Sequence, residues 1–377
     1  MRILIVKLSS IGDVVHTLPA AALLRRSLPE AQIAWVVERR ASAILKGSPI
    51  LNELIEIDTR AWRKQMLSAT TLDEIRARLI HLRGFEGSDG SGKSVDIAID
   101  FQGLLKSGLV AKASGAMRRI GFETGDLREK ASRFFLTEQV ETSHFKHVIE
   151  KNLSLARRAA NGAAATRDTA ADSLSSQYDF PITVSLEDEL YVEQAISERG
   201  ERFAIINPGG GWPTKLWPAH AFGQLADRLH GEHGLVSFIT YGPGEERLAQ
   251  AVASRSRSGA ARPLASTLKQ FVALARRAEL FVGGDTGPLH LAAASGTPVV
   301  GIYGPTSPER NGPFNKRDIT VGRDLWCRTD CHRRSCWHWE CMEITVGEVA
   351  RAVSMRLAAS AVAAASSSCQ KLLEKRD

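Results

Sequence analysis

The residues with the clearest chemical potential lie in the stretch FVGGDTGPLHLAAASGTPVVGIYGPTSPER, positions 281–310. A short apolar run ends at Gly283-Gly284, and an apolar helical pattern begins after Asp285 and Thr286. His290 lies four positions beyond Thr286, which places both side chains on one face of the expected helix. Backbone N–H groups point outward at such a turn, so the pattern predicts a phosphate site. An ordinary turn of an α/β fold is the alternative, because a Gly-rich turn is a weak signal by itself.

A second candidate for anion binding is the segment NPGGGWPTKLWP, positions 207–218. It follows the apolar run 203–206, so three successive glycines come soon after an expected strand. Glycines allow the backbone to approach a ligand closely, and Lys215 adds a point charge beside them. The alternative is a plain loop that carries a surface lysine.

Asp13 is the candidate for proton transfer. Residues 2–8 predict a buried strand, and the turn 9–13 (Ser-Ser-Ile-Gly-Asp) follows it before an amphipathic helix pattern. This order places the carboxylate at the C-terminal edge of a parallel strand, where open α/β sheets bind ligands. The alternative is that Asp13 only caps the helix by accepting backbone N–H bonds.

The excess of positive charge lies in the first half of the chain. Residues 1–170 hold 26 Lys and Arg against 19 Asp and Glu, whereas residues 171–377 hold 23 of each. This asymmetry predicts an anionic partner for the N-terminal part. The densest cluster is Arg60, Arg63 and Lys64 around Trp62, just after an expected strand at 54–57; a solvated loop is the alternative. No zinc-finger spacing, basic heptad helix or aromatic-basic sheet motif indicates nucleic acid.

Four of the five cysteines crowd together near the C-terminus. Cys327, Cys331, Cys336 and Cys341 have the spacing C-x3-C-x4-C-x4-C, with His332 and His338 between them. This set has the chemistry to ligate zinc, but it lacks the paired C-x2-C knuckles of common zinc sites. Reduced cytosolic thiols are the alternative, and we expect no metal.

Alternating strands and helices must position these residues. A chain of 377 residues exceeds one comfortable core and predicts two domains. Further strands are expected at 31–37, 95–100, 119–122, 235–241 and 298–303. The Ala- and Ser-rich stretch 159–177 marks the boundary. We therefore expect α/β lobes at 1–170 and 178–345, followed by a C-terminal helix and tail at 346–377.

The chain shows no sign of export or membrane insertion. No apolar run approaches the roughly 20 residues that a membrane span needs. The N-terminal MRILIVKLSS has the pattern of a strand rather than of a signal peptide, because its apolar run is short and leads into a Gly turn. An odd number of cysteines does not indicate a secreted disulfide framework. We expect a cytoplasmic protein.

Three segments together resemble a known family. KLSSIGDVVHTLPA near the N-terminus, NPGGGWPTKLWP and GGDTGPLHLAAASGTPVVGIYGPT are similar to the signature regions of the heptosyltransferases, glycosyltransferase family 9, which add heptose to the inner core of lipopolysaccharide. The resemblance covers roughly residues 1–345. IDFQGLLKSG (99–108), TRAWRK (59–64) and REKASRFF (128–135) are similar to the branch that adds the first heptose to Kdo. The tail CRTDCHRRSCWHWECMEIT resembles second-heptose enzymes instead, so both branches stay open.

The resemblance implies a GT-B fold, with two Rossmann-like lobes whose parallel sheets face a central cleft. It implies inverting transfer of heptose from ADP-L-glycero-D-manno-heptose to a Kdo2-lipid A-like acceptor at the cytoplasmic face of the inner membrane, which the protein contacts peripherally. Asp13 matches the catalytic base. The chain contains no Asp-x-Asp, so Lys215 and the helix start must neutralise the diphosphate without metal or other cofactor. The donor candidates are Thr214, Lys215, Glu246, Asp285, Thr286, Gly287 and His290, and the acceptor candidates are Ser10, Gly12, Arg60, Arg63, Lys64, Gln102 and Arg119.

Two other classes of protein compete with this hypothesis. An NAD(P)-dependent oxidoreductase uses the same kind of turn, but neither leading strand is followed by G-x-G-x-x-G with an acidic residue about twenty positions later. A non-catalytic binder of anionic glycolipid would keep the basic first half and have no need of Asp13.

Overall fold

The computed structural model divides the chain into two compact units, Met1–Thr183 and Val184–Asp377. It describes residues 1–65, 68–83, 94–161, 178–197, 202–327, 331, 335–337 and 339–373. Most of the predicted boundary stretch, residues 162–177, lies outside these ranges. Among the described helices, none combines the length and the apolar character that a membrane crossing needs.

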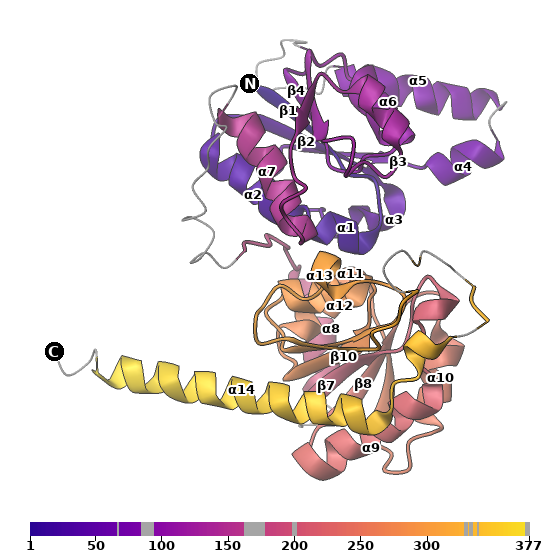
Figure 1. Ribbon diagram of the computed structural model, residues 1–377, viewed down its shortest axis with the longest axis vertical. Helices are drawn as coiled ribbons and strands as arrows, with labels where there is room; N and C mark the ends of the chain where they lie inside the picture. Colours follow the sequence, from indigo (N-terminus) through magenta and orange to yellow (C-terminus); the bar gives the residue numbers. More distant parts are fainter. Residues whose placement is uncertain are drawn as a thin grey trace. The chain divides into compact units, whose positions relative to one another are not determined.

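Unit 1 contains a six-stranded parallel sheet in the order β3-β2-β1-β4-β5-β6. Its central strand β1 is buried along its whole length, as the apolar run predicted. Helices α2 and α7 lie side by side, and α5 and α6 lie away from them (Figure 1). The strands are β1 (Arg2–Val6), β2 (Gln32–Glu38), β3 (Glu53–Ile57), β4 (Ile97–Asp100), β5 (Arg118–Phe122) and β6 (Glu138–Val140); the helices are α1 (Ile11–Val15), α2 (Leu18–Ser27), α3 (Arg39–Ser42), α4 (Thr59–Lys64), α5 (Ala69–Arg83), α6 (Leu105–Ala113), the 3₁₀ helix η1 (Lys130–Phe135) and α7 (Val148–Asn161).

Unit 2 repeats this plan with the order β12-β11-β10-β7-β8-β9, again with parallel pairs throughout. Helix α14 packs the buried residues Val349 and Val353 into the core, and its later part extends away from the unit (Figure 1). The strands are β7 (Phe203–Asn207), β8 (Val236–Tyr241), β9 (Ala261–Ala265), β10 (Leu280–Gly284), β11 (Val299–Tyr303) and β12 (Ile319–Gly322); the helices are α8 (Leu186–Ser197), η3 (Pro213–Lys215), α9 (Ala219–His233), α10 (Glu246–Ala253), α11 (Leu268–Ala275), α12 (Gly287–Ala294), α13 (Pro308–Asn311), η4 (Glu340–Met342) and α14 (Val346–Leu373).

Both sheets reverse their strand order next to their first strand. In unit 1 the chain builds β1, β2 and β3 outward and then returns to place β4 on the other side of β1. In unit 2 it builds β7, β8 and β9 and then returns to place β10 beside β7. Open α/β sheets bind ligands outside the carboxyl ends of the strands at such a reversal. The topology therefore indicates candidate ligand-binding segments after β1 and β4 in unit 1, and after β7 and β10 in unit 2.

The basic cluster around Trp62 forms helix α4, where a solvated loop was the alternative expectation. Asp58 caps this helix, because its Oδ1 accepts the N–H of Ala61 at 2.9 Å. The Trp62 indole packs against the apolar core of unit 1 and donates to Glu74 Oε2 at 3.1 Å. The short helix is thus held by a cap at its N-terminus and by the contacts of Trp62.

Candidate functional site

Asp13 lies in the first turn of α1, directly after β1, at the reversal point of the unit 1 sheet. Its Oδ2 accepts the backbone N–H of Ser10 at 2.8 Å and the Ser10 hydroxyl at 3.0 Å. Its Oδ1 faces Arg128 Nη2 at 3.0 Å and Lys7 Nζ at 3.9 Å. Asp13 does support the start of α1, as the capping alternative held, but only one carboxylate oxygen serves that purpose. The other faces two cations.

These cations keep Asp13 ionised. Burial raises the pKa of the Asp13 carboxyl, but Lys7, Arg128 and the Ser10 N–H together outweigh it and hold that pKa well below its usual range. The Asp13 side chain is 15% exposed and that of Arg128 is 42% exposed, so solvent reaches this pair. The site therefore presents an accessible carboxylate that has its proton-accepting form at neutral pH.

Another side chain at this reversal point is that of Gln102, which follows β4. Its Oε1 accepts the N–H groups of Leu8 and Ser9, at 3.0 and 3.2 Å, and so ties the segment after β1 to the segment after β4. Lys7 makes a similar tie, because its Nζ donates to the carbonyl of Phe101 at 2.6 Å. Gln102 is buried and shapes the loop that carries Asp13. A contact between Gln102 and an acceptor stays a prediction.

The cations predicted for unit 1 fall into two places. Arg60, Arg63 and Lys64 are exposed on α4, which follows β3 and so begins at the same carboxyl edge of the sheet as α1. Among the described residues, none of these three side chains takes part in an ion pair or hydrogen bond. Arg119, by contrast, sits near the start of β5 and donates to the carbonyls of Phe135 and Ala116, both at 2.6 Å. The structure therefore commits Arg119 to backbone and does not bring it to Asp13.

The arginine that does reach Asp13 is Arg128, 115 positions away in the chain. It was absent from the predicted site residues, as was the buried Lys7. The segment 128–135 carried a signal, since it is one of the stretches that resemble a family branch. Lys7 carried another, because a lysine within an apolar strand needs a partner when it is buried.

The unit 2 candidates converge on Asp285, which follows β10. Its Oδ2 accepts Lys215 Nζ at 2.6 Å, and Lys215 also donates to the Asp285 carbonyl at 3.0 Å. Its Oδ1 lies 3.1 Å from His290 Nε2 and 2.8 Å from Asn311 Nδ2. The ring of Trp212 lies 4.9 Å from the Lys215 ammonium. This network fixes the lysine beside the first turn of α12, whose Thr286 and Gly287 were predicted to hold phosphate.

Burial does not neutralise the Asp285 carboxyl. Burial raises its pKa, but the hydrogen bond and charge of His290 and the charge of Lys215 outweigh that effect and hold the pKa far below its usual range. The Asp285 side chain is 2% exposed, against 16% for Lys215. The carboxylate is therefore an internal anchor, and Lys215 is the member of the pair with access to a ligand.

Several glycines of these turns lie where a side chain would crowd its neighbours, whereas a Cβ at Gly211 would meet nothing within 4 Å. A Cβ at Gly210 would come within 3.1 Å of the Thr286 methyl group, and one at Gly284 within 3.0 Å of the Lys215 carbonyl. The acidic residue at the glycine loop is Glu245: a Cβ at Gly209 would lie 2.5 Å from its carboxylate. The predicted Glu246 is exposed instead in the first turn of α10. Thr214 is buried in η3, immediately before Lys215.

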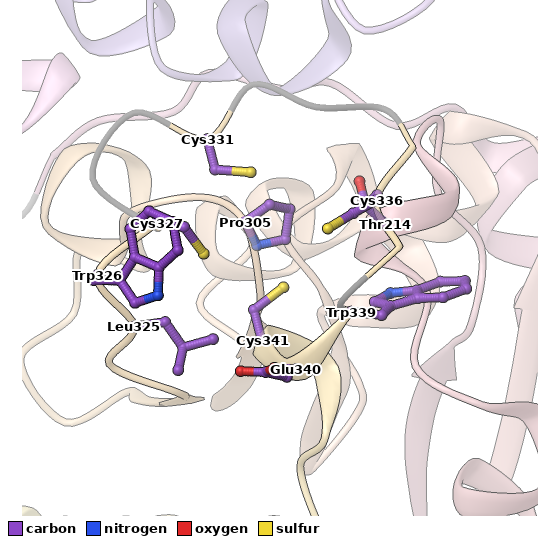
Figure 2. A pocket seen from close by; sticks show the side chains of 10 residues that line it. All are labelled: Thr214, Pro305, Leu325, Trp326, Cys327, Cys331, Cys336, Trp339, Glu340 and Cys341. Carbon is purple, nitrogen blue, oxygen red and sulfur yellow. The ribbon is translucent and has the colours of Figure 1, made fainter.

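The four clustered cysteines line one cavity of about 210 Å³ in unit 2, together with Thr214 and Pro305 (Figure 2). All four are free thiols and half-buried. Burial raises the pKa of the Cys341 thiol, and the other three thiols raise it further. Over the described ranges, no group of three or more His, Cys, Asp or Glu side chains has an arrangement that could hold a metal ion. His332 and His338 lie outside these ranges.

Known proteins resemble the chain in sequence and in structure. The sequence pattern of glycosyltransferase family 9 (heptosyltransferase) matches residues 91–338. Lipopolysaccharide heptosyltransferase 1 of Pseudomonas aeruginosa is 30% identical over 339 residues, which cover 89% of this chain and 87% of that protein. Lipopolysaccharide heptosyltransferase 1 of Escherichia coli K12 is 28% identical over 336 residues, covering 85% and 92%.

Two solved structures have the same fold. The E. coli heptosyltransferase WaaC with ADP has a TM-score of 0.74 at 24% identity, covering 94% of this chain and all of that one. The E. coli ADP-heptose lipopolysaccharide heptosyltransferase II has a TM-score of 0.71 at 22% identity, covering 96% and 99%. The predicted α/β class and GT-B type are confirmed. The chain belongs to glycosyltransferase family 9, the heptosyltransferases, and is a glycosyltransferase.

Proposed function

We propose that this member of glycosyltransferase family 9 transfers a heptose from ADP-L-glycero-D-manno-heptose to a Kdo residue of the lipopolysaccharide inner core. The observation that carries the proposal is the pair of charged sites at the two sheet reversals, Asp13 in unit 1 and Lys215 with Asp285 in unit 2. The 30% identity to a lipopolysaccharide heptosyltransferase 1 over 89% of the chain favours addition of the first heptose over later ones. Membership of this family also sets aside the oxidoreductase and the non-catalytic binder.

Asp13 is the group that accepts the proton of the attacking acceptor hydroxyl. The acceptor oxygen forms a bond to the anomeric carbon, the bond from that carbon to the diphosphate oxygen breaks, and ADP leaves with the electron pair. Attack from the opposite side inverts the anomeric configuration. Ser10 holds one carboxylate oxygen in place, which leaves Oδ1 to meet the hydroxyl once Arg128 gives way.

Lys215 and the first turn of α12 stabilise the charge that develops on the leaving diphosphate. Asp285 and Trp212 hold the ammonium in position before the donor arrives, so little reorganisation is needed during the reaction. The backbone N–H groups at Thr286 and Gly287 add the positive end of the helix dipole. These groups perform the neutralisation that a divalent cation performs in enzymes with an Asp-x-Asp pair, so we infer that transfer is metal-independent.

The exposed cations of α4 are the proposed grip on the acceptor. A Kdo-lipid A-type acceptor carries several carboxylates and phosphates, and arginine matches such groups in a bidentate way. Arg60, Arg63 and Lys64 are not engaged within the described structure, and they lie in the unit that carries the excess positive charge. They are therefore available to an anionic ligand.

Membrane contact is proposed for the face formed by α6 and η1. Leu105 and Leu109 lie one helical turn apart on α6 and are 44% and 56% exposed, and Phe134 of η1 is 73% exposed. The two elements adjoin, since the Glu129 carboxylate, one residue before η1, accepts the Leu105 N–H at 2.6 Å. Exposed apolar side chains together with cations suit an anionic lipid surface. The exposed cations on this face are Lys112, Lys130 and Arg133.

This face also adjoins the proposed base. Arg128, two residues before η1, reaches Asp13 at 3.0 Å. A protein docked by α6 and η1 would hold the acceptor edge of unit 1 close to the lipid surface, at the cytoplasmic side of the inner membrane.

Leu109→Glu with Phe134→Glu should reduce sedimentation with anionic vesicles. Leu190→Glu, at a 59% exposed leucine of α8, is the matched control and should leave it unchanged.

The direct test is transfer by the purified protein. We expect ADP release and a mass increase of the acceptor by one heptose when ADP-L-glycero-D-manno-heptose and Kdo2-lipid A are supplied together. An acceptor that already carries the first heptose should react far more slowly. Transfer to that heptosylated acceptor alone would replace the proposal with second-heptose addition, and the absence of transfer to either would refute it.

A further inference from the structure

The cysteines that line the cavity in unit 2 come from the stretch of the chain between β12 and the end of η4. Its described part between β12 and η4 contains neither a strand nor a helix. Trp326 and Trp337 in this segment are 87% and 82% exposed, so their side chains do not anchor it in a core. Three of the cysteines lie in this segment, and Cys341 lies in η4 at its end. A cross-link among these cysteines would restrict the conformations open to this stretch.

The four thiols nevertheless face a common space. Figure 2 shows the sulfur atoms of Cys327 and Cys336 directed toward each other across the cavity, with the sulfur of Cys331 on one side and that of Cys341 on the other. Pro305 forms the wall behind them. A set of four thiols around one space of about 210 Å³ matches the ligand number and type of a tetrahedral thiolate site.

Neither core packing nor disulfide pairing accounts for this grouping of thiols. A buried core does not require it, because each of the four cysteines is only half-buried. Disulfide pairing does not require it either, because all four are free thiols. The fifth cysteine of the chain, Cys369, belongs to α14 and not to this cavity. The four thiols therefore converge from one stretch of the chain, between β12 and the end of η4.

We propose that Cys327, Cys331, Cys336 and Cys341 bind one divalent metal ion, Zn²⁺ or Fe²⁺, that fastens this segment against Pro305 and Thr214. The four thiols are not yet arranged as ligands in the described residues, so they must close across the cavity when the ion enters. Each thiol loses its proton to solvent, and four metal–sulfur bonds form. The complex carries a net charge of −2, and neither metal nor sulfur changes oxidation state.

The ion has a structural role and takes no part in heptosyl transfer. Thr214 lines the cavity and immediately precedes Lys215, so an ordered segment here supports the loop that carries the donor lysine. Loss of the ion should therefore raise the KM for the donor several-fold, with a smaller effect on the KM for the acceptor. This inference goes beyond the proposed reaction, and metal content can be measured whether or not the protein transfers heptose.

The experiment measures zinc and iron in the full-length protein, purified under reducing conditions, by elemental analysis. We expect about one equivalent of the two metals combined per chain in the wild type and in the Cys369→Ser control. Cys331→Ser with Cys336→Ser should lose nearly all of it. In the wild type, one thiol should react readily with a thiol reagent, and all five should react once the protein is unfolded and a chelator has removed the metal.

A second measurement keeps the proposal testable if the double variant fails to fold. Wild-type protein stripped of metal should bind one equivalent of Co²⁺ with the absorption bands of tetrahedral thiolate coordination, and Zn²⁺ should displace it. Elemental analysis decides between zinc and iron. The proposal is overturned if the purified wild type holds less than about a tenth of an equivalent and the stripped protein binds neither Co²⁺ nor Zn²⁺. Equal metal content in the wild type and a folded double variant would also overturn it.

Discussion

Asp13 and Asp285 both lie at the sheet reversal of their unit, after β1 and after β10, yet their surroundings give them different roles. Each carboxylate follows a strand at the reversal point of a parallel sheet, and nearby cations hold its pKa well below the usual range. Asp285 is 2% exposed, and Lys215, His290 and Asn311 surround its two oxygens. Asp13 is 15% exposed, and its strongest cation contact is with the 42% exposed Arg128.

The difference in burial distinguishes a carboxylate that positions another side chain from one that can contact a substrate. A carboxylate enclosed by three side chains cannot exchange a partner for a substrate without a large cost, so Asp285 serves to position Lys215. A carboxylate whose cation partner is largely in solvent can exchange that partner for an acceptor hydroxyl. The proposal therefore gives two aspartates at sheet reversals different tasks: Asp285 positions Lys215 in unit 2, and Asp13 accepts a proton in unit 1.

The largest expected effect comes from Asp13→Asn. It should lower kcat by about a hundred- to ten-thousand-fold, because the acceptor hydroxyl loses its proton acceptor. The affinity for ADP, measured by calorimetry, should stay at the wild-type value, because the proposed nucleotide contacts lie in unit 2. Asp73→Asn, at an exposed position of α5, is the matched control for loss of one carboxylate. Turnover within a few-fold of wild type would remove Asp13 from the role of base.

Lys215→Ala should differ from Asp13→Asn in its effect on ADP binding. Loss of a charge-assisted contact to the diphosphate should weaken ADP binding and lower kcat/KM by about ten- to a hundred-fold. Under the proposed metal-independent mechanism, a brief exposure of the wild type to EDTA should leave turnover unchanged. Activity that vanishes with EDTA and returns with magnesium would disprove the metal-free account of the donor site.

Asp285→Asn tests whether the ionised Asp285 carboxylate stabilises the fold through its pair with Lys215. Breaking its buried pair with Lys215 should lower the free energy of unfolding at pH 7 by about 3 kcal/mol. The folded-state pKa of Asp285 is lowered, so its contribution is present above the unfolded pKa near 4 and is lost as pH falls toward the folded value. Urea unfolding should therefore show the variant and wild type converging below about pH 4. A stability gap that stays constant down to pH 2 would contradict the ionised anchor.

Arg128→Met tests the exchangeable partner of Asp13. Removing one of the cations that lower the pKa of Asp13 should raise that pKa toward its ordinary value. The base works in its ionised form, so the acid limb of kcat/KM against pH should move to higher pH, while the rate at pH 8 changes only about several-fold. Arg83→Met, at an exposed position at the end of α5, should leave the acid limb in place. An unmoved limb in Arg128→Met would mean that Arg128 does not tune the base.

The smallest expected effect belongs to the exposed cations of α4. Arg63→Ala with Lys64→Ala should raise the KM for the acceptor about several-fold and reduce its dependence on salt, while the donor KM stays constant. Lys316→Ala with Arg317→Ala removes the same charge from an exposed stretch of unit 2 and is the matched control. If the acceptor kinetics match the control at every salt concentration, these cations do not contact the acceptor.

The sequence by itself determined the local framework of both sites. Apolar runs of strand length, followed by turns rich in Gly, Ser and Thr, identified β1, β7 and β10 and the residues that follow them. It also identified Asp13, Lys215 and Asp285, because a turn and its neighbouring side chain are close in the chain, so their relation depends on short-range backbone geometry. The α/β class, the family and the grouping of the cysteines came from the same local patterns.

Only the tertiary structure decided which distant side chains complete each site. Arg128 reaches Asp13 across 115 positions, whereas Arg119, which the sequence favoured, is bound to backbone near the start of β5. Glu245 rather than Glu246 lies at the glycine loop, because one residue along the start of α10 changes the direction of a side chain by about 100°. Sheet order and helix phase set these positions. They follow from packing of the whole unit, which no short stretch of sequence contains.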